Sequence, residues 1–272
     1  MSQIILEAKN LNKTYTQRSG RFGFGTTLVQ ALDNVSIQLR TGSTLAVVGE
    51  SGSGKSTLAR CLLQLQPLES GEVFFQGKDL AQMSGEDLRV TRRDLQMVFQ
   101  DPFASLNPRM RIGEIVGEGL LIHGLGSRDE QKSQVLSMLN RVGLKSEDVK
   151  KYPHEFSGGQ RQRIGIARAL VLSPKVLICD EPVSALDVSV QAQILLLLKE
   201  LQAEMALSTL FISHDLRVVR HIADDIVVMN RGKIVEQGEV AEIYENPTQT
   251  YTQQLLSAIP GQKHLRKQAL NA

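Results

Sequence analysis

Hydrophobic and polar positions along the chain follow two spacings, one typical of β-strands and one typical of α-helices. Short runs that are wholly apolar predict buried strands at residues 45–48, 176–179 and 210–212. Apolar and polar residues alternate over residues 35–39, which predicts a strand with one buried face. Buried strands of this kind, separated by helical segments, favour an α/β fold with a mostly parallel sheet.

Helical spacing marks several segments between these strands. Val135, Met138, Leu139 and Val142 recur three and four residues apart, so they share one face of a helix over residues 130–142. Further helices are predicted at residues 58–63, 157–172, 190–205, 218–222 and 240–259. Further strands are predicted at residues 3–16, 72–77 and 95–99, and as a hairpin at 226–229 and 233–236. Residues 17–30 are polar and rich in glycine, and they predict a mobile loop.

Composition narrows the class of protein. The 272 residues are 42% hydrophobic, which suits one large domain or a domain with subdomains. A net charge of +2 does not indicate a nucleic-acid groove, so we expect no nucleic-acid partner. Cys61 and Cys179 fall in a predicted helix and a predicted strand, which indicates buried thiols in a reducing compartment. No apolar run reaches the length that a membrane-spanning helix needs.

A glycine-rich turn follows the strand at residues 45–48 and leads directly into a helix. It has the pattern G-x-x-x-x-G-K-[ST], formed by Gly49, Glu50, Ser51, Gly52, Ser53, Gly54, Lys55, Ser56 and Thr57. Backbone N–H groups in such a turn point at phosphate oxygens, and the helix N-terminus favours an anion. Lys55 is placed to reach the β- and γ-phosphates, and Ser56 to ligate Mg²⁺. The fold is therefore predicted to be a phosphate-loop NTPase core.

Polar residues also follow other strands at their carboxyl ends, where ligands bind in open α/β sheets. Asp180 is placed to hold Mg²⁺, and Glu181 is the candidate general base for hydrolysis. His214 is the candidate sensor of the γ-phosphate, and Gln100 is placed to reach the metal or the attacking water. The alternatives are an inert acidic pair, a structural histidine and an uninvolved glutamine, and the phosphate loop makes the catalytic interpretation the better one.

A second glycine-rich turn, Ser157, Gly158, Gly159 and Gln160, opens the helix predicted at 157–172. A helix N-terminus of this kind can bind a second anion. The alternative is an ordinary helix cap by Ser157. One bound nucleotide does not need two such turns in one subunit, so we expect this turn to close on a nucleotide held by a partner subunit.

The motifs, in this order along the chain, resemble the nucleotide-binding subunit of an ABC transporter. The resemblance covers about residues 4–260 and implies that two subunits pair head to tail around ATP. It matches Tyr15 to the aromatic residue that stacks on adenine, and a packing role for Tyr15 stays open. It matches Leu186 and Asp187 to a loop that crosses the dimer interface. It also implies an N-terminal antiparallel β subdomain and a helical subdomain at about residues 101–172.

Residues 100–109, 155–163 and 184–191 are similar to the branch that imports oligopeptides, dipeptides and nickel. The C-terminal element, at about residues 233–260, fits the same branch. It departs from the branch pattern at Gln249 and Thr250, where His-Pro is usual, and a polar basic tail, 261–272, follows it. Some members hold an iron–sulfur cluster in a cysteine-rich tail, which this chain lacks.

The resemblance implies an ATPase that uses ATP and Mg²⁺ to power import of peptides, nickel chelates or similar small solutes. It implies a peripheral protein at the cytoplasmic face of the inner membrane, bound to two membrane-spanning permease subunits and a second ATPase subunit, and served indirectly by an extracytoplasmic solute-binding protein. A heterodimer is favoured, while a homodimer, the cargo and the import direction stay open. The alternative is a soluble ABC ATPase in DNA repair or translation. A nucleotide kinase or GTPase does not explain residues 157–160.

Overall fold

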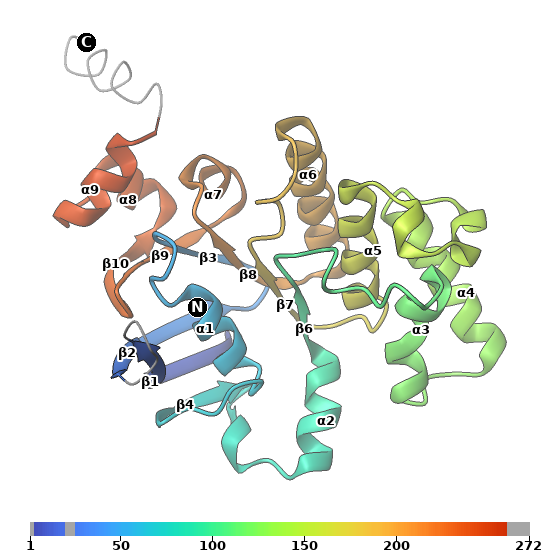
Figure 1. Ribbon diagram of the computed structural model, residues 1–272, viewed down its shortest axis with the longest axis horizontal. Helices are drawn as coiled ribbons and strands as arrows, with labels where there is room; N and C mark the ends of the chain where they lie inside the picture. The colour runs from blue at the N-terminus through green and yellow to red at the C-terminus, as the bar shows by residue number, and fades with distance from the viewer. Residues whose placement is uncertain (1–2, 20–24, 260–272) are drawn as a thin grey trace. The chain divides into compact units, whose positions relative to one another are not determined.

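A computed structural model describes residues 3–19 and 25–259 of the chain (Figure 1). The chain divides into two compact units, residues 1–81 with 211–272, and residues 82–210. Strand β8 (Ser208–Ser213) begins in the second unit and ends in the first. Among the described residues, no helix combines the length and the apolar character needed to cross a bilayer.

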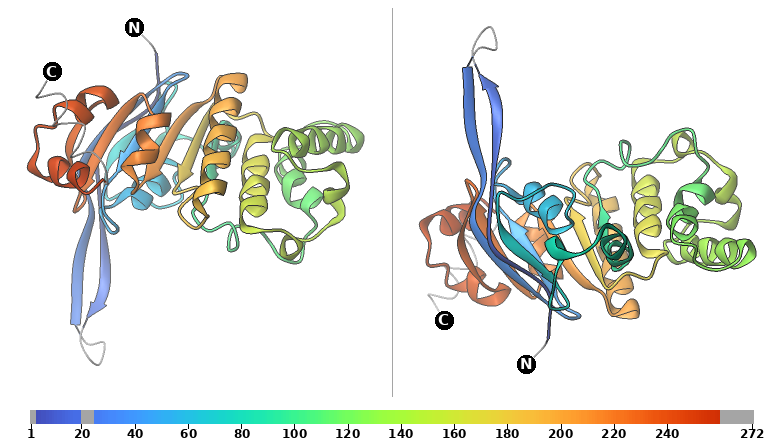
Figure 2. Two further views of the ribbon diagram at one scale, coloured as in Figure 1. Left: turned by 90° about the horizontal axis from the view of Figure 1, so that it is seen from above. Right: turned by 90° about the horizontal axis from the view of Figure 1, so that it is seen from below.

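The first unit contains an antiparallel sheet in the order β2-β1-β4-β5. Its strands are β1 (Ile4–Ser19), β2 (Gly25–Arg40), β4 (Ser70–Phe75) and β5 (Lys78–Asp79). Val35, Ile37 and Leu39 of β2 are buried and alternate with more exposed residues, which confirms the predicted half-buried strand. Figure 2 shows the outer half of the β1–β2 hairpin, in blue, extending beyond the strands beside it.

The predicted loop at residues 17–30 is wrong for 17–19 and 25–30, which belong to the hairpin, while residues 20–24 lie outside the described part. Tyr15 pairs with Val29 and Thr16 with Leu28. The glycines in this segment favoured a loop, but threonine, tyrosine and valine, which flank them, are residues that favour strands. Strand pairing therefore extends as far as Ser19 on β1 and Gly25 on β2.

The other sheet of this unit is built around the buried strand β3 (Thr44–Val48). β3 pairs in parallel with β9 (Asp225–Asn230), which pairs antiparallel with β10 (Lys233–Glu239), as the predicted hairpin requires. The helices of the unit are α1 (Lys55–Leu62), α7 (Leu216–Ile222), α8 (Val240–Glu245) and α9 (Thr250–Ser257). Apolar side chains of α7, α8 and α9 form one cluster with buried residues of β3 and β9.

The helix predicted over residues 240–259 is instead two helices. α8 ends at Glu245 and α9 starts at Thr250, with Asn246 and Pro247 between them. Proline cannot donate the helical hydrogen bond and disfavours helical geometry in the residue before it, and Asn246 has left the helical region, with φ −131° and ψ 55°. The break turns α9 relative to the path that one continuous helix would take.

The second unit contains β6 (Leu95–Val98) and β7 (Val176–Asp180), which pair in parallel. Its α-helices are α2 (Gly85–Asp94), α3 (Ile112–Ile122), α4 (Arg128–Arg141), α5 (Gly158–Leu170) and α6 (Val188–Met205). The unit also contains the short 3₁₀ turns η2 (Ser146–Lys150) and η3 (Pro153–Glu155), while η1 (Leu80–Gln82) lies where the first unit ends and the second begins. Val135, Met138 and Leu139 of α4 are buried, as their spacing predicted.

Candidate nucleotide site

The phosphate loop of the first unit connects β3 to α1, as the sequence predicted. Lys55, the first residue of α1, is only 4% exposed. Its Nζ donates hydrogen bonds to the carbonyl oxygens of Gly49 and Glu50, both at 2.8 Å. Burial of an ammonium group is costly without polar partners. The loop thus folds back on Lys55 and holds a concentrated positive charge at the start of a helix.

Gly54 shows why this turn needs glycine and why it fits a phosphate. Its φ is +106°, and a Cβ atom would lie 2.2 Å from the carbonyl oxygen of Ala31. Gly54 is also the N-cap of α1, where it provides no side-chain cap, and the first turn of α1 has no acidic residue. The first N–H groups of a helix lack helical partners and attract anions. Together with Lys55, this arrangement fits a polyphosphate.

Tyr15 and His214 belong to the same unit. The hydroxyl group of Tyr15 is hydrogen-bonded to the side-chain oxygen of Gln66, just after α1, and the Lys13 ammonium lies 5.5 Å from the centre of the ring. These contacts give the packing interpretation of Tyr15 a physical basis. His214 is exposed and follows β8. A hydrogen bond from Arg217 lowers the pKa of the neighbouring Asp215, so this acid is ionised beside His214 at neutral pH.

The second unit brings three of the predicted residues together at the ends of β6 and β7. Asp180 ends β7 and is 3% exposed, while Glu181 follows it and is half-buried. Gln100 lies two residues beyond β6, and its Nε2 donates a hydrogen bond to Oε2 of Glu181 at 3.0 Å. A side chain that the sequence placed near the attacking water therefore contacts the candidate base directly.

Glu181 has a strained backbone, which the sequence did not indicate. Its φ is +46°, in the left-handed region that non-glycine residues avoid at a cost of about 1–2 kcal/mol. The turn is held by Ser184, whose N–H and hydroxyl groups both donate to the carbonyl oxygen of Glu181, at 3.3 and 3.1 Å. Strain of this kind concentrates at functional sites. Seven other non-glycine residues of the described chain also have a positive φ, so the strain is not specific to Glu181.

The second glycine-rich turn forms the start of α5, as expected. The Ser157 hydroxyl accepts from the Gln160 N–H at 3.4 Å, and the Gln160 side chain accepts from the Ser157 N–H at 3.0 Å. The cap interpretation of Ser157 is thus realised. Gly159 lies against α6, because a Cβ there would be 2.4 Å from Cγ1 of Val190. The turn is therefore packed closely enough on α6 to exclude a side chain at this position.

Two arginines of α5 hold the segment that follows Gln100, and sequence reasoning had not singled them out. The Arg161 guanidinium lies over the Phe103 ring, 4.1 Å from its centre. Arg168 donates to the carbonyl oxygen of Ser105. Burial lowers the pKa of Arg168 from its usual value, so this cation is held in a largely dry setting. Long polar side chains on a helix usually face solvent, and for this reason the sequence alone did not indicate the link.

The two cysteines are buried, as predicted, and both are free thiols. Burial raises the pKa of Cys61 to about 11, despite the opposing charge of Lys13. Burial also raises the pKa of Cys179, and the negative charge of Asp180 adds to this effect. In the described part of the chain, no cluster of three or more histidine, cysteine or acidic residues is arranged to hold a metal ion.

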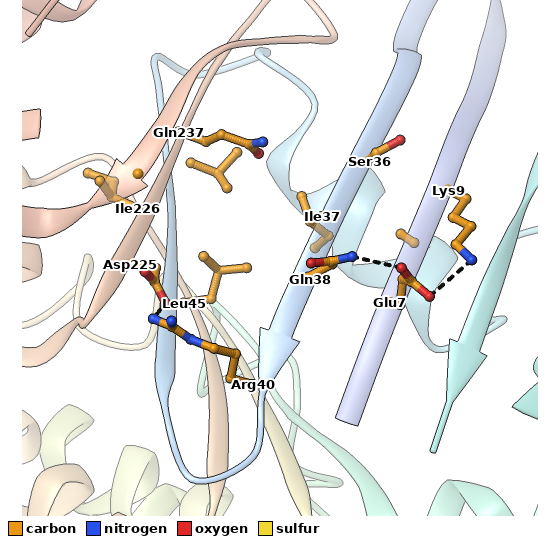
Figure 3. Close-up of a pocket in the computed structure, with 13 residues that line it drawn as sticks. Glu7, Lys9, Ser36, Ile37, Gln38, Arg40, Leu45, Asp225, Ile226 and Gln237 are labelled. Atoms are coloured by element: carbon orange, nitrogen blue, oxygen red, sulfur yellow. Dashed lines mark hydrogen bonds and ion pairs between the residues drawn. The ribbon is translucent and has the colours of Figure 1, made fainter. Parts of the chain in front are cut away.

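A separate pocket of about 650 Å³ lies in the first unit, lined by β1, β2, β3, β9 and β10 (Figure 3). It lies beside Leu45 at the start of β3, whereas the phosphate loop follows the end of that strand. Arg40 pairs with Asp225, and Glu7 pairs with Lys9 at 3.2 Å. The acidic and basic groups of the lining neutralise one another. This pocket therefore carries no net charge, whereas the phosphate loop holds the buried Lys55 ammonium group.

The phosphate loop on an α/β core, with Asp180 and Glu181 after a buried strand, defines a phosphate-loop ATPase. The family profile described as "ABC transporter" matches residues 32–184. The chain belongs to the ABC transporter family, in the branch of oligopeptide and dipeptide importer ATPases.

Individual relatives support this assignment. The chain is 52% identical over 260 residues to the dipeptide transport ATP-binding protein DppF of Escherichia coli, covering 96% of this chain and 78% of that protein. It is 51% identical over 261 residues to the oligopeptide transport ATP-binding protein OppF of Salmonella typhimurium, with coverages of 95% and 78%. A dimeric structure of the ATP-binding cassette MJ0796, in a post-hydrolysis state with ADP and Pi, superposes with a TM-score of 0.76 at 30% identity, covering 87% of this chain and 99% of that one.

These relationships confirm the predicted α/β phosphate-loop fold with its antiparallel β subdomain. The chain is an ATPase subunit of an ABC importer, and it uses ATP and Mg²⁺. The alternative of a soluble ATPase in DNA repair or translation gains no support from them. When bound, Mg²⁺ supplies charge neutralisation at the phosphates.

Proposed function

We propose that this chain powers the uptake of peptides, nickel chelates or similar small solutes from the cytoplasmic face of the inner membrane. In this proposal it is a peripheral subunit bound to two membrane-spanning permease subunits, with an extracytoplasmic solute-binding protein delivering cargo to them. The observation that carries the proposal is the identity of about half of all residues, over nearly the whole chain, to subunits named for dipeptide and oligopeptide transport.

We further propose that each site residue keeps the role its chemistry suggests. Lys55 and the loop N–H groups hold the phosphates, while Ser56, Asp180 and Gln100 hold the metal. Glu181 accepts a proton from the attacking water, and its contact with Gln100 supports this role because the amide fixes the carboxylate by a 3.0 Å hydrogen bond. The remaining roles are adenine stacking for Tyr15 and γ-phosphate contact for His214.

We propose that the turn at residues 157–160 binds the nucleotide of a second ATPase subunit. The turn supports this because Gly158 and Gly159 are the first two residues of α5, where backbone N–H groups without helical partners attract an anion. A heterodimer is favoured and a homodimer is the alternative. The ATPase domain then comprises residues 1–260, with a helical subdomain at about 101–172, a C-terminal element at about 233–260 and a basic tail at 261–272.

The permease contact has a specific candidate in the second unit. A groove of about 760 Å³ is lined by α3, α4 and η2. Its lining includes the apolar side chains of Leu121, Val135 and Leu136, and the charged side chains of Arg111 and Arg128 among others. Leu121 is 70% exposed, although it is a large apolar side chain. We propose that an apolar cytoplasmic segment of a permease subunit binds in this groove. Helix α3, which follows the segment after Gln100, would then transmit closure of the ATPase dimer to the permease.

The test is to recover the tagged chain from detergent-solubilised membranes and identify what accompanies it. We expect two membrane-spanning proteins and a second ATPase, whereas recovery alone, or with DNA or ribosomes, would overturn the importer assignment. Leu121→Asp should reduce recovery of the permease at least ten-fold, the equivalent of about 1.4 kcal/mol. Leu196→Asp is the matched control, because Leu196 is 61% exposed and lies outside the groove. Equal recovery with both variants would remove the groove from the interface.

A further inference from the structure

The C-terminal element of the first unit reaches the phosphate loop. The hydroxyl oxygen of Tyr251, in α9, accepts a hydrogen bond from the backbone N–H of Glu50 at 3.2 Å. Tyr251 is 201 residues further along the chain than Glu50, and it lies outside the region matched by the family profile. A phosphate-loop N–H group is thus held by a side chain from a separate, later helix.

The peptide unit that Tyr251 contacts is the same one that holds Lys55. The peptide between Gly49 and Glu50 donates its N–H to Tyr251, and its carbonyl oxygen, that of Gly49, accepts from Nζ of Lys55 at 2.8 Å. Peptide groups are planar, so fixing the N–H direction also fixes the direction of the carbonyl group. Hydrogen bonds in such a chain also polarise one another. The Tyr251 hydroxyl therefore helps to aim the carbonyl group that holds Lys55.

Helix α9 is anchored well enough to serve as a fixed support. Leu256 is 2% exposed and belongs to the apolar cluster that also contains Val48, the last residue of β3. The carboxylate of Glu236 accepts hydrogen bonds from the backbone N–H of Thr248 at 2.7 Å and of Gln249 at 3.2 Å. These bonds hold the entry to α9, whose N-cap residue forms no side-chain cap of its own. Tyr251 is thus attached to the core independently of the phosphate loop.

We propose that Tyr251 is a positioning residue for nucleotide binding, which acts through the Gly49–Glu50 peptide and keeps the phosphate loop in its binding conformation. The C-terminal element, through this one hydroxyl group, then raises the affinity of the first unit for ATP and ADP. The preorganised loop binds phosphate without having to be ordered first, which is the general advantage of a preformed site.

Tyr251→Phe tests this proposal because it removes the hydroxyl group and keeps the ring. The full-length protein is titrated with a fluorescent ATP analogue, which is then displaced with ADP. We expect the Kd for both nucleotides to rise about three- to five-fold, the effect of losing one ordinary hydrogen bond. The turnover number at saturating ATP should change little, because the bond supports binding and does not touch the reacting atoms. The thermal midpoint without nucleotide should also stay near that of the wild type.

Tyr244→Phe is the matched control. Tyr244 lies in α8, and its buried hydroxyl donates to the carbonyl oxygen of Leu216, away from the phosphate loop. This variant should lower the thermal midpoint and leave the nucleotide Kd unchanged. The proposal is overturned if Tyr251→Phe binds nucleotide as tightly as the wild type, or if both variants raise the Kd equally, since that result would reflect general loosening of the C-terminal element.

Discussion

Substituting alanine for Gly159 tests the close packing of the turn at residues 157–160 on α6. The added Cβ would lie 2.4 Å from Cγ1 of Val190, with Cβ and Cγ2 of the same side chain at 3.8 and 3.9 Å. Carbon atoms in good contact are about 3.5–4.0 Å apart, so one methyl group is more than about 1 Å too close. Valine in a helix has one strongly preferred χ1, so rotating this methyl group away from the added Cβ also costs energy.

The expected loss of stability in Gly159→Ala follows from two opposing effects. Forcing an extra carbon into a packed site costs about 1–3 kcal/mol. Alanine also has a higher helix propensity than glycine, which offsets up to about 1 kcal/mol of this cost. We therefore expect Gly159→Ala to lower the free energy of unfolding by about 1–2 kcal/mol, and the thermal midpoint by about 2–4 °C for each kcal/mol.

A double-mutant cycle with Val190→Ala separates this contact from general effects. Val190→Ala removes both methyl groups, so Gly159→Ala should be much less harmful in that background. We expect a favourable coupling of at least about 1 kcal/mol between the two substitutions, measured by thermal unfolding and by urea denaturation. Additive effects, or a Gly159→Ala protein as stable as the wild type, would refute the close approach of the turn to α6.

Further predictions concern hydrolysis and pH. Glu181→Gln should lower ATP turnover by about 10²–10⁴-fold with nucleotide binding retained, because the amide cannot accept the proton; turnover near the wild-type rate would remove Glu181 from the base role. Burial raises the pKa of the Cys61 thiol from 9.0 to about 11 in the folded protein. The stability that the thiol contributes is therefore complete below pH 9.0 and is lost as pH rises toward 11. The thermal midpoint of the wild type should therefore fall over this pH range, and that of Cys61→Ala should fall less. If the two thermal midpoints fall in parallel with pH, the raised pKa of Cys61 is contradicted.

Local sequence patterns predicted the elements that carry the site, and did so where one physical cause dominates. An apolar run such as residues 45–48 can be satisfied only by burial, and the structure buries every residue of β3. The turn that follows needs glycine at position 54, because φ is +106° and a carbonyl group lies where a side chain would be. Each of these requirements restricts the residue type at a particular position, so it can be recognised from a single amino-acid sequence.

The predictions failed where short-range preferences competed. Glycines near residues 20–25 suggested a loop over 17–30, but pairing with β1 decided the conformation of Leu28 and Val29. The helical pattern over residues 240–259 ignored Pro247, whose ring and missing N–H end one helix before the next begins. Partner strands and backbone breaks outweighed composition in both places.

The sequence by itself determined the chemistry of this protein: a phosphate loop with Lys55, acidic residues after a buried strand, and a second glycine-rich turn. Only the tertiary structure decided which groups touch. It brings Gln100 to Glu181 across 81 residues, and Tyr251 to Glu50 across 201. The residues of a motif are determined by local backbone geometry and chemistry, whereas contacts between distant residues depend on how strands and helices pack. Packing depends on many residues at once, so the spacing of apolar residues within one segment does not reveal which distant segment it contacts.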